Sequence, residues 1–372
     1  MNEKNVKKER LYYIDGYKGM LCFLIMVGHF WNIYRHGGES PLNHTLLDLV
    51  NNAALSDILL LATFWLYAFL VISGYLLSNT TIKSVSEILL KLLNRFLRFF
   101  LPILGACCFI YIIQQCIGFY ADETKEFFTY GWFQKYYAII LTWQAIFRET
   151  GKAMFSGSCA FNAPFWVIRD MFVSSLMIYI CKFADSIYKK RVDLLPAFFM
   201  LSAIIVDNQV LVACLAGFMI GHYKEAINVL TEKIENFVII AVAVFWCFLW
   251  LHSKYVLPDI FDKFLAYTLI HCFFLILLNR INILQRIFSL KPFLLAGKIS
   301  FGVYAFHWPV ICSFGSLVLI KGMESELNGL LIYVASFLVS VVFTVVISIL
   351  YYFTVENFSN KIISWIKKFT VS

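Results

Sequence analysis

The first apolar segment of the chain, IDGYKGMLCFLIMVGHF, carries a lysine and a histidine eleven residues apart, Lys18 and His29. Eleven residues are close to three helical turns, so both side chains lie on one face of a helix, about 16 Å apart. This spacing places His29 near the middle of a membrane and Lys18 at its inner mouth. Because histidine titrates near neutral pH, His29 is a candidate general base. A structural histidine that bonds to a neighbouring helix is the alternative.

Two arginines, Arg95 and Arg98, lie three residues apart in the segment NRFLRFFLP. Residues at this spacing lie on one side of a helix. Guanidinium groups bind phosphates through paired hydrogen bonds, so the two arginines suit a phosphate-bearing ligand such as coenzyme A. Ordinary anchoring of a helix at the cytoplasmic face is the alternative.

The segment PFWVIRDMF holds Arg169 and Asp170 within an apolar run, and Trp166 precedes them. An isolated charge in such a run is costly, so the two residues are expected to pair with each other or across helices. A structural ion pair and a role in a site are equally open. Trp166 is a further candidate for the same site.

His307 lies in GKISFGVYAFHWPV, two residues before Pro309, which lacks a backbone donor and is expected to kink the helix. Taken alone, His307 is most simply a buried structural histidine. The rise per residue nevertheless puts His29 and His307 in the middle third of the membrane, with Asp170 within about 5–10 Å of that depth. Polar groups at one depth predict a shared cavity.

These residues must be positioned by membrane helices. The chain has 372 residues, of which 61% are hydrophobic and 15% are charged, whereas soluble domains are about half apolar and a quarter charged. Many apolar runs reach the roughly 18 residues that indicate a spanning helix. The composition predicts an all-α, polytopic membrane helical bundle of about ten transmembrane helices. The predicted spans are 17–34, 58–78, 99–118, 164–183, 194–206, 210–222, 237–252, 263–279, 299–320 and 329–353.

The distribution of positive charge predicts the orientation of the bundle. Most of the 31 Lys and Arg residues fall on one side when the N- and C-termini are both cytoplasmic. The apolar piece 136–147 is too short to span and is expected to be re-entrant or interfacial. The chain, 1–372, is expected to form one integral membrane domain, with a basic N-terminal tail, 1–16, and a cytoplasmic C-terminal tail, 354–372.

Charge and cysteine usage argue against several other classes of function. The net charge of +8 is explained by basic residues that collect in cytoplasmic loops of membrane proteins. It therefore gives no reason to expect a nucleic acid partner. Most of the ten cysteines lie in apolar runs, where Cys acts as a small hydrophobe. The sequence has no CxxC pair and no HxxxH spacing, so no metal site is predicted.

Taken together and in order, these segments resemble acyltransferase family 3, a family of integral membrane proteins. The family opens with a pattern like LDGLRGxxxxxxxxGH, where this chain has IDGYKGMLCFLIMVGHF. Its second helix carries FxxSGYLL, here FLVISGYLLS with Ser73, and its third begins with RxxR, here RFLR. Its ninth helix reads like GxxSYxxYLxHxP, here GKISFGVYAFHWPV, and its final VE recurs as Val355 and Glu356. The resemblance covers roughly residues 10–360.

The resemblance implies an enzyme, an O-acyltransferase whose catalytic histidine is His29. It implies that Arg95 and Arg98 bind the acyl donor, and that Lys18 replaces an arginine, which keeps the charge but loses the planar fork. Asp170 would be a second catalytic residue; its carboxylate lies one position earlier than in the family's WSLSVE pattern, as in members that read WFLRD. Further candidates for the site are Arg169, His307, Trp166 and Ser73.

The expected donor is acetyl-CoA, a co-substrate that enters from the cytoplasm. The expected acceptor is a hydroxyl of a surface polysaccharide, such as a capsule, or of a lipid-linked glycan, with His29 as base or acyl carrier. Membrane lipid and polysaccharide-assembly proteins are the other expected partners, and a multi-pass position in the cell membrane, commonly the bacterial inner membrane, is the expected location. A transporter or flippase, or a non-catalytic subunit in polysaccharide export, remain alternatives.

Overall fold

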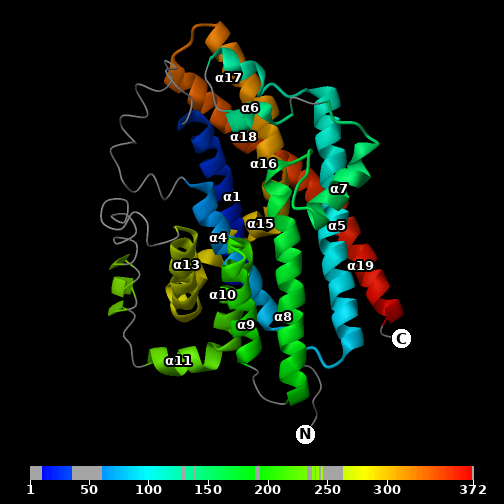
Figure 1. The fold of residues 1–372 in the computed structure, drawn as a ribbon. Helices are drawn as coiled ribbons and strands as arrows, with labels where there is room; N and C mark the ends of the chain where they lie inside the picture. The colour runs from blue at the N-terminus through cyan, green and yellow to red at the C-terminus, as the bar shows by residue number, and fades with distance from the viewer. Residues whose placement is uncertain are drawn as a thin grey trace.

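The computed structural model describes residues 11–35, 61–127, 131–137, 140–188, 193–232, 237–238, 240–242, 244–245 and 263–370. Within these ranges the chain folds into helices joined by turns, without a strand, which confirms the predicted all-α class for this part of the chain. Figure 1 shows α5 and α8 side by side along most of the molecule. In chain order the helices and helical turns are α1 (Tyr12–Arg35), α4 (Ala62–Ser78), α5 (Val85–Cys116), η1 (Glu123–Glu126), α6 (Gly131–Lys135), α7 (Ala145–Phe155), η2 (Ala163–Val167), α8 (Ile168–Tyr188), α9 (Leu194–Ile205), α10 (Gln209–His222), α11 (Lys224–Glu232), α13 (Lys263–Arg280), α14 (Asn282–Phe288), α15 (Lys291–Lys298), α16 (Ser300–Val310), η3 (Ile311–Gly315), α17 (Ser316–Glu324), α18 (Gly329–Tyr351), η4 (Tyr352–Glu356) and α19 (Asn357–Thr370).

Several of these helices are long and apolar enough to cross a membrane. Helices α4 and α9 are apolar but have only 17 and 12 residues. A further span is formed if α10 and the start of α11, which meet at a bend of 70°, are counted as one. The lengths identify a membrane protein, whereas the count of ten spans stays a prediction, and part of the predicted span 237–252 lies outside the described residues. The four segments that qualify by themselves are Val85–Cys116, Lys263–Arg280, Ser300–Glu324 and Gly329–Ile366.

Helix α5 begins well before the predicted span 99–118. The predicted span follows the apolar run, whereas Ser84 and Glu87 form a helix start before it. The Ser84 Oγ accepts a hydrogen bond from the Glu87 amide (3.2 Å), and the Glu87 carboxylate accepts one from the Lys83 amide (2.9 Å). Reciprocal bonds of this kind satisfy amides that the first turn leaves unpaired. The basic residues therefore continue one helix of 32 residues.

The last two predicted helices are present, and each contains a wide turn. The predicted helix 299–320 consists of α16 and α17, joined by η3 directly after Val310. Because Pro309 has no amide hydrogen, the regular hydrogen-bond ladder cannot continue through it. The predicted helix 329–353 corresponds to α18, which leads through η4 into α19. Most of the predicted C-terminal tail is therefore helical.

Glycines allow α4 and α10 to pack backbone against backbone. A Cβ atom on Gly74 would lie 1.7 Å from the Cys214 carbonyl oxygen, and one on Gly217 would lie 1.8 Å from the Val71 carbonyl oxygen. Only glycine fits at either position, in the manner of small residues at membrane helix interfaces. The two glycines come from opposite helices, so the contact is reciprocal and fixes the register of α4 against α10.

Polar side chains tie further helices together. The Asn279 Oδ1 on α13 accepts hydrogen bonds from the Tyr13 hydroxyl of α1 (2.9 Å) and from the Tyr75 hydroxyl of α4 (3.0 Å). The Tyr351 hydroxyl of α18 donates to the Pro102 carbonyl of α5 (2.5 Å). Each of these bonds pairs a polar group that would be costly to leave unpaired in an apolar interior.

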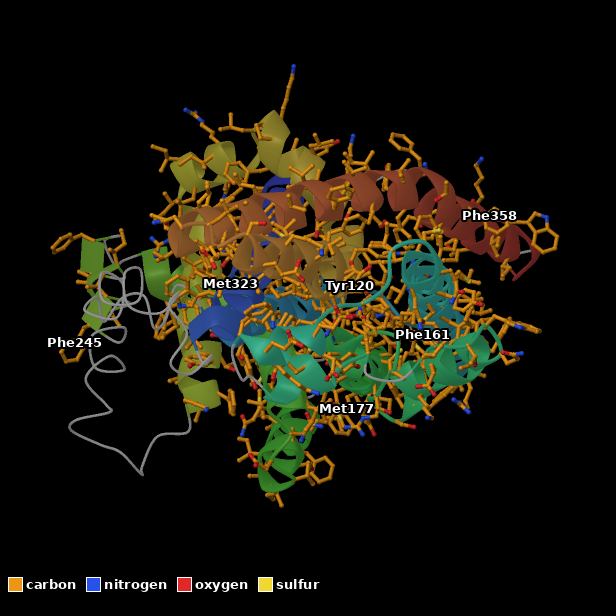
Figure 2. The ribbon with its side chains drawn as sticks, turned by 90° about the horizontal axis from the view of Figure 1, so that it is seen from above. Tyr120, Phe161, Met177, Phe245, Met323 and Phe358 are labelled. Carbon is orange, nitrogen blue, oxygen red and sulfur yellow. The ribbon has the colours of Figure 1, made fainter. Side chains whose placement is uncertain are left out.

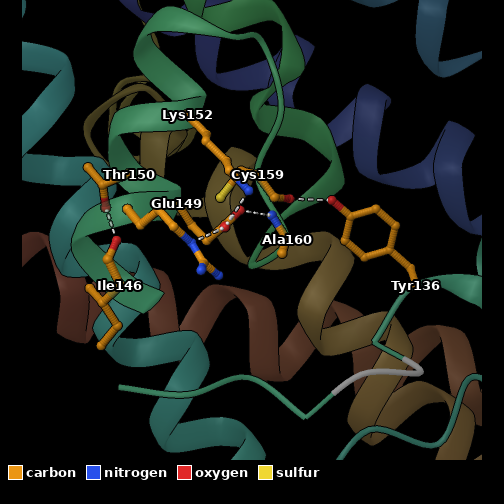
Figure 3. A network of polar contacts seen from close by, with 8 residues as sticks. Tyr136, Ile146, Glu149, Thr150, Lys152, Cys159 and Ala160 are labelled. Carbon is orange, nitrogen blue, oxygen red and sulfur yellow. Dashed lines mark hydrogen bonds and ion pairs between the residues drawn. The ribbon is translucent and has the colours of Figure 1, made fainter. Parts of the chain in front are cut away.

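A buried carboxylate holds the loop between α7 and η2. Figure 3 shows the Glu149 carboxylate accepting hydrogen bonds from the Lys152 Nζ (2.8 Å) and the Ala160 amide (2.9 Å). It also accepts one from the Arg148 Nε (3.1 Å). Burial raises the pKa of the Glu149 carboxyl, but the hydrogen bonds from Lys152, Ala160 and Arg148 outweigh burial and leave the pKa below its ordinary value. The carboxylate therefore stays charged and keeps the loop folded against α7.

Two tyrosines reach the same loop from the preceding segment. The Tyr136 hydroxyl donates to the Cys159 carbonyl (2.5 Å) and the Tyr137 hydroxyl to the Phe161 carbonyl (2.7 Å). In the predicted interfacial segment 136–147, residues 136–137 and 143–144 form turns, 140–142 have no regular structure, and α7 begins at Ala145. Seen from above, Phe161 lies among the helices and Phe358 of α19 at their edge (Figure 2), in keeping with exposed fractions of 0% and 63%.

The glycine contact predicts a matched pair of stability effects. Gly217→Val forces α4 and α10 apart and should lower the free energy of unfolding by about 1–3 kcal/mol or more. A Cβ atom on Gly151 of α7 meets nothing within 4 Å, so Gly151→Ala should stabilise the protein by about 0.5–1 kcal/mol through its higher helix propensity. Thermal unfolding in detergent measures both, and equal melting temperatures for the two variants would contradict the close contact.

The Glu149 contacts predict a pH-dependent effect. The folded-state pKa of Glu149 is lowered, so its contribution is present above its unfolded pKa of about 4.3 and is lost as the pH falls through the folded pKa. Glu149→Gln should therefore lower stability by about 1–3 kcal/mol at neutral pH. The difference from the wild type should shrink below about pH 4. Melting temperatures between pH 3 and 8 measure it, and a constant difference would refute the role of the charge.

Candidate active site

Two histidines that are far apart in the sequence face each other between α1 and α16. The His29 and His307 rings stack with their centroids 5.2 Å apart and an interplanar angle of 23°. The Trp308 ring packs edge-on against His29, at 5.6 Å. His307 is fully buried, whereas His29 remains partly exposed. The sequence predicts only that these two histidines lie at the same level along their helices. The structure shows that their rings are in direct contact.

Hydrogen bonding fixes the state of the His307 ring. Its Nδ1 lies 3.0 Å from the Val303 carbonyl oxygen. A carbonyl only accepts, so Nδ1 carries the hydrogen, and in the neutral ring Nε2 carries the lone pair. That Nε2 is buried and has no hydrogen-bond partner. Two imidazolium rings stacked at this distance would repel strongly in an apolar interior, so at most one of the pair is charged.

Pro309 leaves one carbonyl of α16 without its helical donor, and a loop residue supplies the donor instead. In a helix the Ala305 carbonyl would accept from the amide four residues later, but that residue is Pro309. The Asn162 Nδ2 supplies the missing donor at 2.8 Å. The residue before Ala305, Tyr304, donates its hydroxyl to the Pro164 carbonyl. Asn162 and η2 are thereby fixed against α16.

Arg95 lies inside the bundle with uncharged partners. Its Nε donates to the Ser175 hydroxyl on α8 (3.0 Å), and its Nη2 to the Ser73 hydroxyl on α4 (3.3 Å). Its guanidinium carbon lies 4.5 Å from the centroid of the Phe99 ring, a cation–π contact. These contacts orient the guanidinium without neutralising it. The predicted candidate Ser73 is thus a direct partner of Arg95.

The two arginines of the RFLR motif differ in exposure. Arg98 is exposed and Arg95 is partly buried, yet both lie near enough to Tyr179 for their charges to act on its hydroxyl. Lys18 is partly exposed, with its Nζ 3.9 Å from an Asp15 carboxylate oxygen. Glu356 lies near Lys18 and the backbone of α16, which brings the VE motif to the end of the bundle that carries Lys18.

Arg169 and Asp170 pair with each other, one of the alternatives left open by the sequence. The Arg169 Nε and Nη2 donate to the two carboxylate oxygens of Asp170, at 2.8 and 3.2 Å. Asp170 is buried, whereas the Arg169 side chain is 42% exposed. Because both carboxylate oxygens are occupied, this arrangement fits an ion pair better than a free base. Trp166 is 44% exposed in η2, directly before α8.

Asn162 and Ser175 are the residues that sequence reasoning missed. Asn162 lies in a loop outside every motif, and its partner Ala305 is 143 residues away. The available signal was Pro309, because a proline inside a helix always leaves one carbonyl in need of a donor. Ser175 has no comparable signal. In the described part of the chain, no three His, Cys, Asp or Glu side chains gather as metal ligands would.

Comparison with known proteins gives one match. A family model described as an acyltransferase domain, that of acyltransferase family 3, matches residues 11–352. No curated protein matches the chain, and no solved structure matches it. The matched range takes in α1 with His29, the arginines of α5 and the histidine of α16, and it covers most of the chain. The chain therefore belongs to acyltransferase family 3.

Proposed function

We propose that this membrane acyltransferase moves an acetyl group from acetyl-CoA to a hydroxyl of a surface polysaccharide or lipid-linked glycan, with His29 as base or acyl carrier. The observation that carries the proposal is the place of His29. His29 as a residue is partly exposed, and its ring stacks on His307 between α1 and α16. A reactive imidazole needs this combination of access for substrates and shelter from bulk water, because water would hydrolyse the thioester.

The surroundings of Arg95 support an anionic donor. Among the described residues, no carboxylate forms an ion pair with this guanidinium, which is held by two serine hydroxyls and an aromatic ring. A partly buried cation of this kind gains from a bound anion such as a coenzyme A phosphate. Arg98, which is exposed, would add to the attraction for the phosphates of the donor. Lys18 lies on the same face of α1 as His29, about 16 Å from it along the helix.

The chemistry can follow two routes from this geometry. As a base, His29 takes the proton of the acceptor hydroxyl while its oxygen attacks the thioester carbon. The carbon–oxygen bond forms, the carbon–sulfur bond breaks, and the coenzyme A thiolate receives the proton. As an acyl carrier, His29 attacks the thioester carbon, so that a carbon–nitrogen bond forms while the carbon–sulfur bond breaks and the coenzyme A thiolate leaves. The acceptor oxygen then bonds to the same carbon as the carbon–nitrogen bond breaks, and the hydroxyl proton passes to the thiolate. Both routes begin with a neutral imidazole at His29.

The orientation and location are part of the same proposal. We place the N-terminus and the C-terminus in the cytoplasm and the protein in the cell membrane, so that the donor approaches from the Lys18 end of α1. The acceptor then approaches the opposite end of that helix, where membrane lipid and polysaccharide-assembly proteins could present it. A transporter or a non-catalytic export subunit would use the same location without acetylating the glycan.

Substitution of His29 tests the proposed reaction. His29→Ala should lower acetyl transfer to the surface glycan at least about 100-fold, because both routes use the imidazole. His271→Gln is the matched control, since His271 is a buried histidine whose Nε2 lies 2.8 Å from the Phe64 carbonyl on other helices. Mass spectrometry of the glycan, at equal protein levels, measures the acetyl content. Unchanged acetylation in His29→Ala would refute the enzyme and leave an export role.

Substitution of Arg95 tests the donor site. Arg95→Lys keeps the charge but cannot bond to Ser73 and Ser175 in the same way, so KM for acetyl-CoA should rise about tenfold with a smaller change in kcat. Arg286→Gln, an exposed arginine of α14 at the same expected face, is the control. Initial rates in detergent measure both variants. Equal KM values for Arg95→Lys and the wild type would place the phosphates elsewhere.

A further inference from the structure

Two buried cysteines from separate parts of the chain meet beside α7. Cys107 lies on α5 and is 0% exposed, and Cys159 lies in the loop between α7 and η2 and is 5% exposed. Their two thiols form a hydrogen bond with each other, and both cysteines are free. A buried cysteine usually acts as a small hydrophobe. A direct contact between two thiols that are far apart in the sequence is a different arrangement and needs its own account.

The loop holds Cys159 firmly in this position. The Cys159 carbonyl accepts a hydrogen bond from the Tyr136 hydroxyl (2.5 Å), and the amide of the next residue, Ala160, donates to the Glu149 carboxylate (2.9 Å), as Figure 3 shows. The Asn162 side chain bonds the same loop to α16. The backbone is thus fixed on both sides of Cys159, so its side chain stays against α5.

Hydrogen-bond donors surround the Cys159 sulfur. Besides the Cys107 thiol, the amides of Phe161 and Asn162 donate to it. The hydrogen bond from Cys107, together with those from the two amides, lowers the pKa of the Cys159 thiol, although burial and the nearby Glu149 carboxylate act to raise it. The thiolate is the form that attacks a disulfide. Cys159 is therefore the attacking member of the pair, and Cys107 is positioned to resolve the product.

The loop faces a compartment in which thiols are oxidised. With the N-terminus in the cytoplasm, as proposed above, α1, α4 and α5 are the first three crossings, so the loop that follows α5 and α7 opens on the outer side. Disulfides form and persist outside the cytoplasm and are rare inside it. The inference below needs this orientation but does not depend on acyl transfer.

We propose that Cys107 and Cys159 form a disulfide that ties the α7–η2 loop to α5, with a small-molecule or protein disulfide of the outer compartment as oxidant. The Cys159 sulfur attacks one sulfur of the oxidant, a mixed disulfide forms, and the thiolate that leaves takes the Cys159 proton. The Cys107 sulfur then attacks the Cys159 sulfur, the mixed disulfide breaks, and the second thiolate leaves with the Cys107 proton. Two cysteine thiols are oxidised and one external disulfide is reduced to two thiols.

The disulfide adds a covalent bond to a loop that is otherwise held by hydrogen bonds. Because Asn162 fastens this loop to α16, the new bond connects α5 to α16 through the loop. It also closes a segment of about 50 residues, which restricts the unfolded chain. The melting temperature of the oxidised protein should therefore exceed that of the reduced protein by about 3–8 °C.

Peptide mass spectrometry of the wild type tests the bond directly. The full-length protein in detergent is equilibrated with mixtures of oxidised and reduced glutathione, its remaining thiols are alkylated, and it is digested without reduction. A peptide pair joined through Cys107 and Cys159 should appear in most molecules at the oxidising end of the series and disappear at the reducing end. Absence of this pair at every ratio, or its formation only after the protein is denatured, overturns the proposal.

Two variants separate this pair from the other cysteines. Cys108→Ser is the matched control, because Cys108 is the next residue on α5 and is turned by about 100° around the helix. It should keep both the linked peptide and the difference in melting temperature between oxidised and reduced protein, whereas Cys159→Ala should lose both. A link from Cys159 to Cys108, or a difference that persists in Cys159→Ala, assigns the bond wrongly and overturns the pair. Acetyl transfer enters none of these measurements, so they are independent of the test at His29.

Discussion

The carbonyl of Ala305 sets the constraint on which the candidate site depends. A proline four residues later cannot satisfy it, and water is scarce among packed membrane helices, so a donor must come from elsewhere in the chain. Asn162 provides that donor across 143 residues of sequence. The bond brings the α7–α8 connection onto α16, where the Tyr304–Pro164 bond reinforces it. The Glu149 contacts and the two tyrosine hydroxyls hold the same connection from its other side.

The hydrogen-bonding groups of the bundle separate into two kinds of surroundings. Around Arg95, donors and positive charge are in excess, since its partners are hydroxyls and an aromatic ring. On α16 and its neighbouring loop, two buried acceptors, the His307 Nε2 and the Asn162 Oδ1, have no hydrogen-bond donor in the described part of the chain. His29 stacks on His307.

The sequence predicts helices better than it predicts helix ends and contacts. The apolar run 210–222 corresponds closely to α10, because it has a uniform composition and a clear start at Asn208, whose side chain accepts from the Leu211 amide. The predicted span 99–118 begins later than α5, because apolar content marks the part of a helix that can cross a membrane and not its capped start at Ser84. The spacing of Arg95 and Arg98 suggested a pair, yet one side chain packs against α4 and α8 while the other is exposed. Spacing gives the face of a helix but not which neighbour covers it.

The contact between His29 and His307 illustrates the same limit at the site. Rise per residue placed both rings at one depth, but depth along two helices says nothing of the rotation of either helix. Rotation is decided by close contacts such as that of Gly19 on α1 with Gly297 on α15, and of Gly302 on α16 with Ser348 on α18. A Cβ atom on Gly302 would lie 2.8 Å from the Ser348 Cβ, so a larger residue there would push α16 away from α18. The glycines far from the reactive rings thus determine whether the rings meet.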